Sequence, residues 1–158
     1  MKKLLLVLVS ATIFFSCNKK DDNNNGSGNL SNDQFRIGAT TFSANSVTSV
    51  SGLLAAVGTN GAMKGSISIV FNTSLFPTNN GTYKIVDNPD ADDEIYITAG
   101  TNIGGTLTAY ASTGNNTNFT ADVTVNDNGK ITIVLSDVWV KNGASNDSVK
   151  ISANITQQ

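Results

Sequence analysis

Few side chains in this sequence could perform chemistry. It has one cysteine and no histidine, which excludes Ser-His-Asp and Cys-His nucleophilic sites and the zinc and iron sites built on histidine. Glu94 is the only glutamate and Arg36 the only arginine. Because phosphate neutralisation needs clustered Lys and Arg, and the formal net charge here is -2, we expect no nucleic-acid partner.

Paired carboxylates, as in glycosidases, are the catalytic chemistry that stays open. Most aspartates fall in predicted turns or in the polar stretch near the N-terminus, where turn formation accounts for them. Asp122 points outward by strand parity, and Asp137 interrupts a strand as a bulge or an edge charge. We therefore expect a protein without catalytic residues or cofactor, with a carboxylate-dependent glycosidase as an alternative.

The densest acidic segment lies between two predicted strands and suggests a weak Ca²⁺ site, because Ca²⁺ takes oxygen ligands. Its members are Asp87, Asp90, Asp92 and Asp93. In a simple meander this segment shares one end of the sheet with the Asn60-Gly61 turn, with residues 113–118 (including Asn115 and Asn116) and with residues 142–147 (including Asp147). The segment is not an EF-hand, because Asp93 stands where that loop needs glycine and Ala99 where it needs glutamate. The alternative is a solvated hairpin tip.

Aromatic side chains that could stack on a sugar ring are the other candidates for a binding surface. Trp139 falls on the same face as Ile133 and Leu135 if the strand runs on without a bulge, which predicts a core residue. A bulge at Ser136-Asp137 would instead expose the indole. Tyr96 and Tyr110 lie opposite their aliphatic neighbours, on the second face of two-sided strands. The sequence does not distinguish a glycan partner from a protein partner.

The N-terminal segment does not belong to the fold. A basic start is followed by the apolar run of residues 4–15, which is shorter than the roughly 20 residues of a membrane-spanning helix and is typical of a signal peptide. Phe14-Phe15-Ser16-Cys17 resembles the lipobox of bacterial lipoproteins, although Phe14 stands where that motif usually has leucine. The resemblance implies that residues 1–16 are removed and that Cys17 carries the lipid. Two or more acyl chains suffice to hold a protein on a membrane.

The residues after Cys17 contain a second localisation signal. Lys19-Lys20-Asp21-Asp22 is similar to the signal that sends lipoproteins of Bacteroidota to the outer face of the outer membrane. Asn18 is not the aspartate that commonly retains lipoproteins at the inner membrane. Residues 17–33 have little to bury and should form a flexible tether with a span of about 20 Å. The remaining residues 34–158 have the length of one domain.

A modification site is suggested near the C-terminus. Asp147-Ser148-Val149 resembles the short Asp-Ser/Thr-aliphatic sequence at which Bacteroidota O-glycosylate exported proteins. It follows a turn-forming stretch, so Ser148 should be accessible. The alternative is a chance match at a junction between loop and strand.

The elements that must position these residues are strands. Apolar and polar residues alternate with period two in most segments, and Asn-Gly pairs punctuate them at turns. We expect strands at residues 35–44 (bent at Gly38), 47–57 (interrupted near Gly52), 66–71, 82–86, 94–98, 105–112, 118–125, 130–135, 138–141 and 148–156. Short strands joined by short turns predict an all-β domain, an antiparallel β-sandwich or, alternatively, a flattened up-and-down β-barrel.

Two stretches of the domain carry a broader resemblance. Residues 76–85 (FPTNNGTYKI) and the later Gly129-Lys130-Ile131 stretch are similar to small uncharacterised β-rich lipoproteins of Bacteroidota, which enter a strand through Gly-Thr-Tyr and form a late hairpin through Asn-Gly-Lys. The resemblance implies an exported β-domain and brings no catalytic residue. We expect an outer-membrane lipoprotein at the cell surface that acts as a binding or structural module, with a carbohydrate-binding accessory of a glycan-uptake system as the alternative.

Overall fold

The computed structural model describes residues 30–113, 118–145 and 147–158, and these residues form ten strands without a helix. The strands are β1 (Gln34–Ile37), β2 (Thr40–Val50), β3 (Leu53–Asn60), β4 (Met63–Phe71), β5 (Gly81–Val86), β6 (Glu94–Ile103), β7 (Thr106–Ala111), β8 (Thr120–Val125), β9 (Ile131–Lys141) and β10 (Ser148–Thr156). The predicted all-β class is confirmed.

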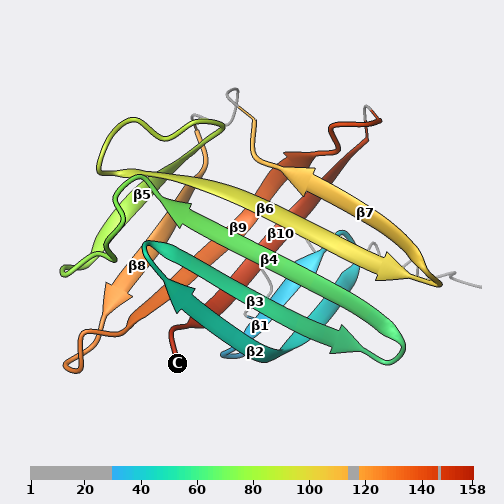
Figure 1. The fold of residues 1–158 in the computed structure, drawn as a ribbon, viewed down its shortest axis with the longest axis horizontal. Coiled ribbons are helices and arrows are strands. Elements are labelled where there is room, and N and C mark those ends of the chain that lie inside the picture. Colours follow the sequence, from blue (N-terminus) through green and yellow to red (C-terminus); the bar gives the residue numbers. More distant parts are fainter. Residues whose placement is uncertain (1–29, 114–117, 146) are drawn as a thin grey trace, which may run out of the picture.

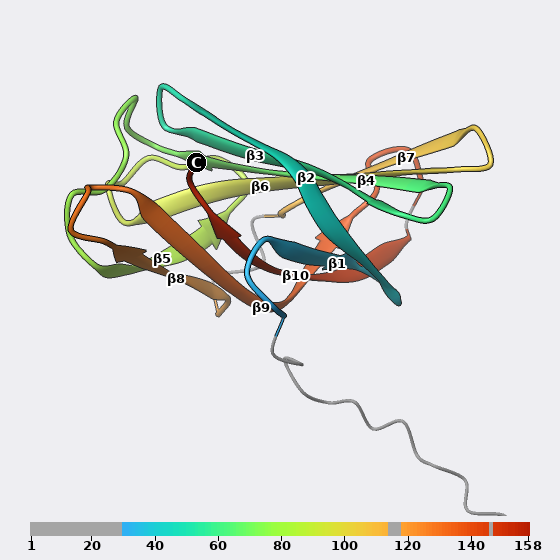
Figure 2. The same ribbon diagram turned by 90° about the horizontal axis from the view of Figure 1, so that it is seen from below.

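Hydrogen bonds join the strands into one ring, in the order β10-β1-β2-β3-β4-β6-β5-β8-β9 and back to β10. β7 is attached along β6 and touches β9 at a single residue pair. All pairings are antiparallel except the parallel one between β5 and β6. The ring is flattened, so that β2, β3, β4, β6 and β7 form a front layer in Figure 1, and β1, β5, β8, β9 and β10 form a back layer, which lies below it in Figure 2.

The core lies between the two layers and is built by the predicted alternation. In β4 and β6 the inward positions are buried, among them Ile67, Ile69, Ile95 and Ile97. The outward positions of the same strands form the surfaces of the molecule. Each strand of this kind therefore contributes to the core and to an outer face at once.

Two predicted strands are divided differently in the structure. Residues 35–44 are not one bent strand but β1 and β2, because Gly38 (φ 61) forms the turn of a hairpin between them. The expected interruption near Gly52 is the β2–β3 turn. Gly52 has φ 74, and a Cβ there would lie 2.2 Å from the carbonyl oxygen of Thr73, so the chain passes where only glycine fits.

The segments predicted as two strands at residues 130–135 and 138–141 form the single strand β9, which contains a β-bulge. The pairing with β10 shifts at this point, so that Ser136 and Asp137 both oppose Ser152. Asp137 has φ 41, in the left-handed region. The bulge reverses the side-chain parity, so Val138 is buried and Trp139 faces solvent. The prediction that Trp139 belongs to the core is therefore wrong, for the reason named as its alternative.

The described chain begins on the outer side of the back layer (Figure 2). The side-chain amide of Asn154 donates to the carbonyl of Leu30 at 3.1 Å, and the Asp33 carboxylate accepts the backbone N–H of Thr156 at 3.0 Å. The last residues of the predicted tether are thus fastened to β10. Within the described ranges, no helix is long and apolar enough to cross a membrane.

Candidate binding site

The outer face of the front layer holds a groove floored by small side chains. Cross-strand pairing places Ser66 of β4, Gly100 of β6 and Ala109 of β7 side by side on this face. Gly100 offers no side chain to fill the space between its neighbours, and a Cβ there would lie 3.2 Å from Oγ of Ser66. The hollow therefore arises from residue size along one row of the sheet.

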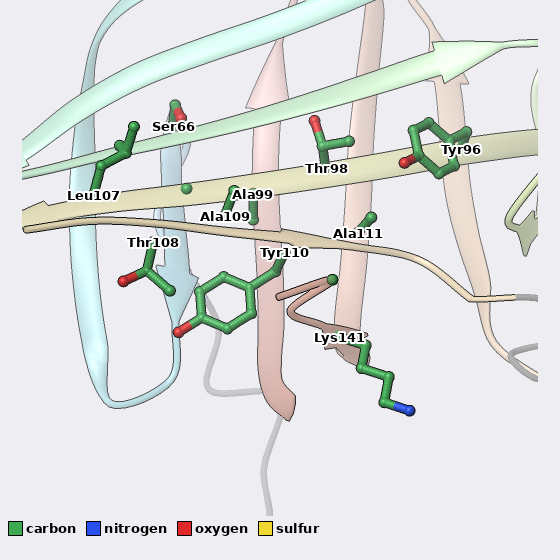
Figure 3. Close-up of a pocket in the computed structure, with 12 residues that line it drawn as sticks. Ser66, Tyr96, Thr98, Ala99, Leu107, Thr108, Ala109, Tyr110, Ala111 and Lys141 are labelled. Carbon is green, nitrogen blue, oxygen red and sulfur yellow. The ribbon is translucent and has the colours of Figure 1, made fainter. Parts of the chain in front are cut away.

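The groove has a volume of about 420 Å³ and runs between Tyr96 and Leu107. Hydroxyls and methyl groups dominate its wall, and among the described residues that line it Lys141 alone is charged. Figure 3 shows Thr98 and Leu107 on one side of the β6–β7 pair and Tyr110 on the other, so the hollow extends around the edge of β7. A smaller hollow of about 170 Å³ continues it across β4 toward β3.

β7 has a free edge beside this groove. The N–H of Ser112 donates to the carbonyl of Ile97, and alternate residues of an antiparallel strand bond to the same neighbour. The backbone groups of Leu107 and Ala109 therefore point away from β6, and within the described residues β7 meets β9 only through Ala111 and Lys141. The side chain of Leu107 is 76% exposed. An unpaired strand edge of this kind accepts another extended chain.

The outer face of the back layer is organised around the bulge in β9. Arg36 donates to the carboxylate of Asp137 at 2.7 Å and to the hydroxyl of Ser152 at 3.1 Å. Ser152, only 2% exposed, donates to the same carboxylate at 2.7 Å and accepts the backbone N–H of Asp137 at 3.3 Å. Three strands are joined through one carboxylate, which holds the bulge in place.

Burial by itself raises the pKa of the Asp137 carboxyl. Hydrogen bonds from Ser152 and Arg36, and the charges of Arg36 and Lys150, act against burial and prevail, so the pKa lies below its ordinary value. The carboxylate therefore stays ionised at neutral pH. An ionised group tied to two strands is a structural element and not a general acid.

Trp139 stands next to this ionic cluster. Nζ of Lys150 lies 5.6 Å from the centre of the indole ring, a cation–π distance, and 3.9 Å from the Asp137 carboxylate. The indole keeps 45% of its surface exposed. Tyr96, by contrast, lies on the outer face of the front layer, and Tyr110 packs against the core. The described residues therefore present no platform of three coplanar aromatics.

The acidic segment of residues 87–93 is joined to β5 by an ion pair. The Asp93 carboxylate pairs with Nζ of Lys84 at 2.8 Å, with both side chains about half exposed (53% and 54%). The hydrogen bond between them lowers the pKa of Asp93 and raises that of Lys84. Nowhere in the described ranges do three acidic side chains converge as metal ligands. The predicted calcium site of Asp87, Asp90, Asp92 and Asp93 finds no support in this geometry, and Asn115 and Asn116 lie outside the described residues.

The predicted gathering of loops at one end is wrong for the Asn60-Gly61 turn. β4 and β6 are antiparallel, with Phe71 beside Ile95 and Lys64 beside Asn102. The turn before Lys64 therefore lies at the far end of β6 from the acidic segment that precedes it. The parallel β5–β6 pairing breaks the simple meander on which the prediction rested.

Glu94 has a structural role at the start of β6. Its carboxylate accepts the backbone N–H groups of Asp90 at 2.9 Å and of Ala91 at 3.2 Å. The hydrogen bond from Asp90 is the main cause of a lowered Glu94 pKa. A glycosidase acid needs a raised pKa, so Glu94 is unsuited to that task. Asp122, exposed as predicted, accepts a hydrogen bond from Thr82 at 3.0 Å.

A third hollow, of about 480 Å³, lies under the β4–β5 connection. The ring of Phe71 meets Phe76 and Tyr83 edge to face, at centroid distances of 5.9 and 5.2 Å. Burial, followed by the charges of Asp92 and Asp93, raises the pKa of Tyr83. Asp92 is the only acidic residue that lines any of the three hollows described here. None of them holds the pair of carboxylates that glycoside hydrolysis requires.

Two predicted modification sites differ in what the structure says of them. Ser148 is the exposed first residue of β10, at the junction of loop and strand. Cys17 lies outside the described residues.

Comparison with protein-family models, with curated proteins and with solved structures gives no match for this chain.

Proposed function

We propose that this protein is a lipoprotein of the outer membrane, anchored through Cys17 and exposed at the cell surface, whose β-domain binds a partner and does not catalyse a reaction. The observation that carries the binding role is the groove between Tyr96 and Leu107, which lies on the front layer, whereas the tether joins the back layer. The groove is therefore turned away from the point of attachment. Its lining, which is uncharged apart from Lys141, and the free edge of β7 suit an extended partner.

The anchor is tested by Cys17→Ala. No other cysteine can accept the lipid, so the variant should be soluble or keep its signal peptide, whereas Ser148→Ala should fractionate with the outer membrane like the unaltered protein. The measurement is membrane fractionation followed by the intact mass of the product. A correctly cleaved Cys17→Ala protein that still sediments with the outer membrane would refute the anchor.

Surface exposure rests on Lys19 to Asp22 and needs its own experiment. Protease treatment of intact cells should remove the domain, while a periplasmic marker protein survives. Replacing Lys19, Lys20, Asp21 and Asp22 by serine and glycine should protect the domain without releasing it from the membrane. Full protection of the unaltered protein would place it in the periplasm.

A glycan is the second candidate partner, because hydroxyls and the ring of Tyr96 line the groove. Neutral oligosaccharides should then bind the purified mature protein, as measured by calorimetric titration. Gly100→Leu would fill the floor of the groove and abolish binding, whereas Val134→Leu, on the back layer, should leave it unchanged. Binding that survives Gly100→Leu would exclude the groove as the glycan site.

A further inference from the structure

The outer face of the back layer carries an exposed indole, which the front layer lacks. Trp139 and Val134 are exposed apolar side chains on this face, 45% and 39% accessible. Cross-strand pairing puts Trp139 beside Lys150 and Val134 beside Asn154, so both lie along the β9–β10 pair. Arg36 joins them from β1. An indole beside a lysine is typical of the boundary between lipid and water.

The tether enters on the same face. Asn154, which binds the carbonyl of Leu30, is four residues from Lys150 along β10, or about 13 Å at the usual rise of a strand. Only residues 18–29 separate Cys17 from Leu30, and their composition predicts a span of about 20 Å. A lipid at Cys17 therefore brings this face, before any other, close to the membrane surface.

The position of the acidic segment is compatible with the same orientation. The acidic residues 87–94 belong to the connection between β5 and β6 and to the start of β6, away from the β9–β10 pair. The back-layer face itself carries charges of both signs: Arg36 and Lys150 lie beside the Asp137 carboxylate, and Asp122 stands opposite Val134. Anionic headgroups repel the acidic segment and therefore disfavour the orientations that turn it toward the membrane.

We propose that the back-layer face around Trp139 rests on the surface of the membrane that carries the anchor, with the indole at the level of the headgroups. This inference depends on the proposed lipid at Cys17. It adds a defined orientation to the anchored domain, in which the bulge at Asp137 directs Trp139 to the lipid and the groove of the front layer faces away from the membrane.

Trp139 is the only tryptophan of the chain, so its fluorescence tests the orientation directly. The mature lipidated protein is reconstituted in vesicles of phosphatidylcholine and phosphatidylglycerol (7:3) that contain a headgroup-proximal nitroxide lipid. We expect a blue shift of about 10 nm relative to soluble Cys17→Ala protein and at least a twofold loss of emission. Iodide in the buffer should quench the anchored protein less than the soluble one.

A matched variant moves the reporter to the front layer. Trp139→Phe combined with Leu107→Trp places an indole at a position that is 76% exposed in the groove, where the nitroxide should not reach it and iodide should. Equal nitroxide quenching of both reporters, or none of Trp139, would overturn the orientation. Flotation of the vesicles separates the two proposals: protein that does not float refutes the anchor, and protein that floats with unquenched Trp139 refutes the orientation alone.

Discussion

The two outer faces of the domain are made by the same alternation of residues and yet differ in kind. The front face is hollow because Ser66, Gly100 and Ala109 stand in one row, and no ion pair crosses it among the described residues. On the back face Arg36 and Ser152 both donate hydrogen bonds to the Asp137 carboxylate, and the indole of Trp139 is exposed because of the bulge at Asp137. Small residues alone suffice to make a groove, whereas a displaced aromatic needs a network that keeps the backbone in an uncommon conformation.

Deletion of Asp137 should have the largest effect on the difference between the two faces. Ser136 and Asp137 both oppose Ser152, so the deletion leaves Ser136 in that place and keeps Val138 and Val140 inward and Trp139 outward. It removes the carboxylate that binds Arg36 and Ser152, and the largely buried guanidinium of Arg36 loses its ion-pair partner. We expect a loss of about 3 kcal/mol or more in the free energy of unfolding, while the emission of Trp139 stays that of an exposed indole. Urea unfolding followed by tryptophan fluorescence measures both. An unchanged midpoint would show that the Asp137 carboxylate does not stabilise the back face.

Arg36→Met comes next in size. It removes the main cation facing Asp137 and leaves a partly buried carboxylate with Ser152 and the more distant Lys150. The expected cost is about 2 kcal/mol in the free energy of unfolding at pH 7. Lys150→Met is the matched control, since its ion pair is long and partly exposed, and should cost less than about 0.5 kcal/mol. Equal effects of the two changes would contradict the assigned network.

The third prediction concerns pH. The folded-state pKa of Asp137 is lowered, so its ionised form stabilises the fold above the unfolded-state pKa of about 3.9, and this contribution is lost as the pH falls through the folded-state value. Asp137→Asn should therefore cost about 1–2 kcal/mol at pH 7 and progressively less in acid. Parallel urea titrations of both proteins between pH 7 and pH 3 measure the difference. A difference that does not change with pH would assign the effect to the backbone of the bulge.

The smallest effect is expected on the front face. Leu107→Ser replaces a side chain that packs against little in the monomer, and it should change the free energy of unfolding by less than about 0.5 kcal/mol. The same urea titration provides the measurement. A cost of 1 kcal/mol or more would mean that the free edge of β7 is covered in solution, which sedimentation velocity would then detect as a second copy.

Much of the domain was predictable from local pattern. Alternation of apolar and polar residues predicted the strands and the inward set of β4, β6 and the first half of β9. Asn60-Gly61 lies at the β3–β4 hairpin as its composition indicates, because such residues accept a positive φ. The proposed anchor at Cys17 also comes from sequence alone, since it depends on residues that precede the domain.

The tertiary structure decided what depends on partners distant in sequence. Whether Trp139 is buried follows from the bulge, and the bulge is held by Arg36 and Ser152, which lie 101 and 15 residues from Asp137. The parallel pairing of β5 with β6 separates loops that a meander would bring together. Local alternation determines which residues share a face of one strand, but the register and neighbours of that strand are set by long-range hydrogen bonds and packing, and these decide which faces become a groove, a core or a surface for the membrane.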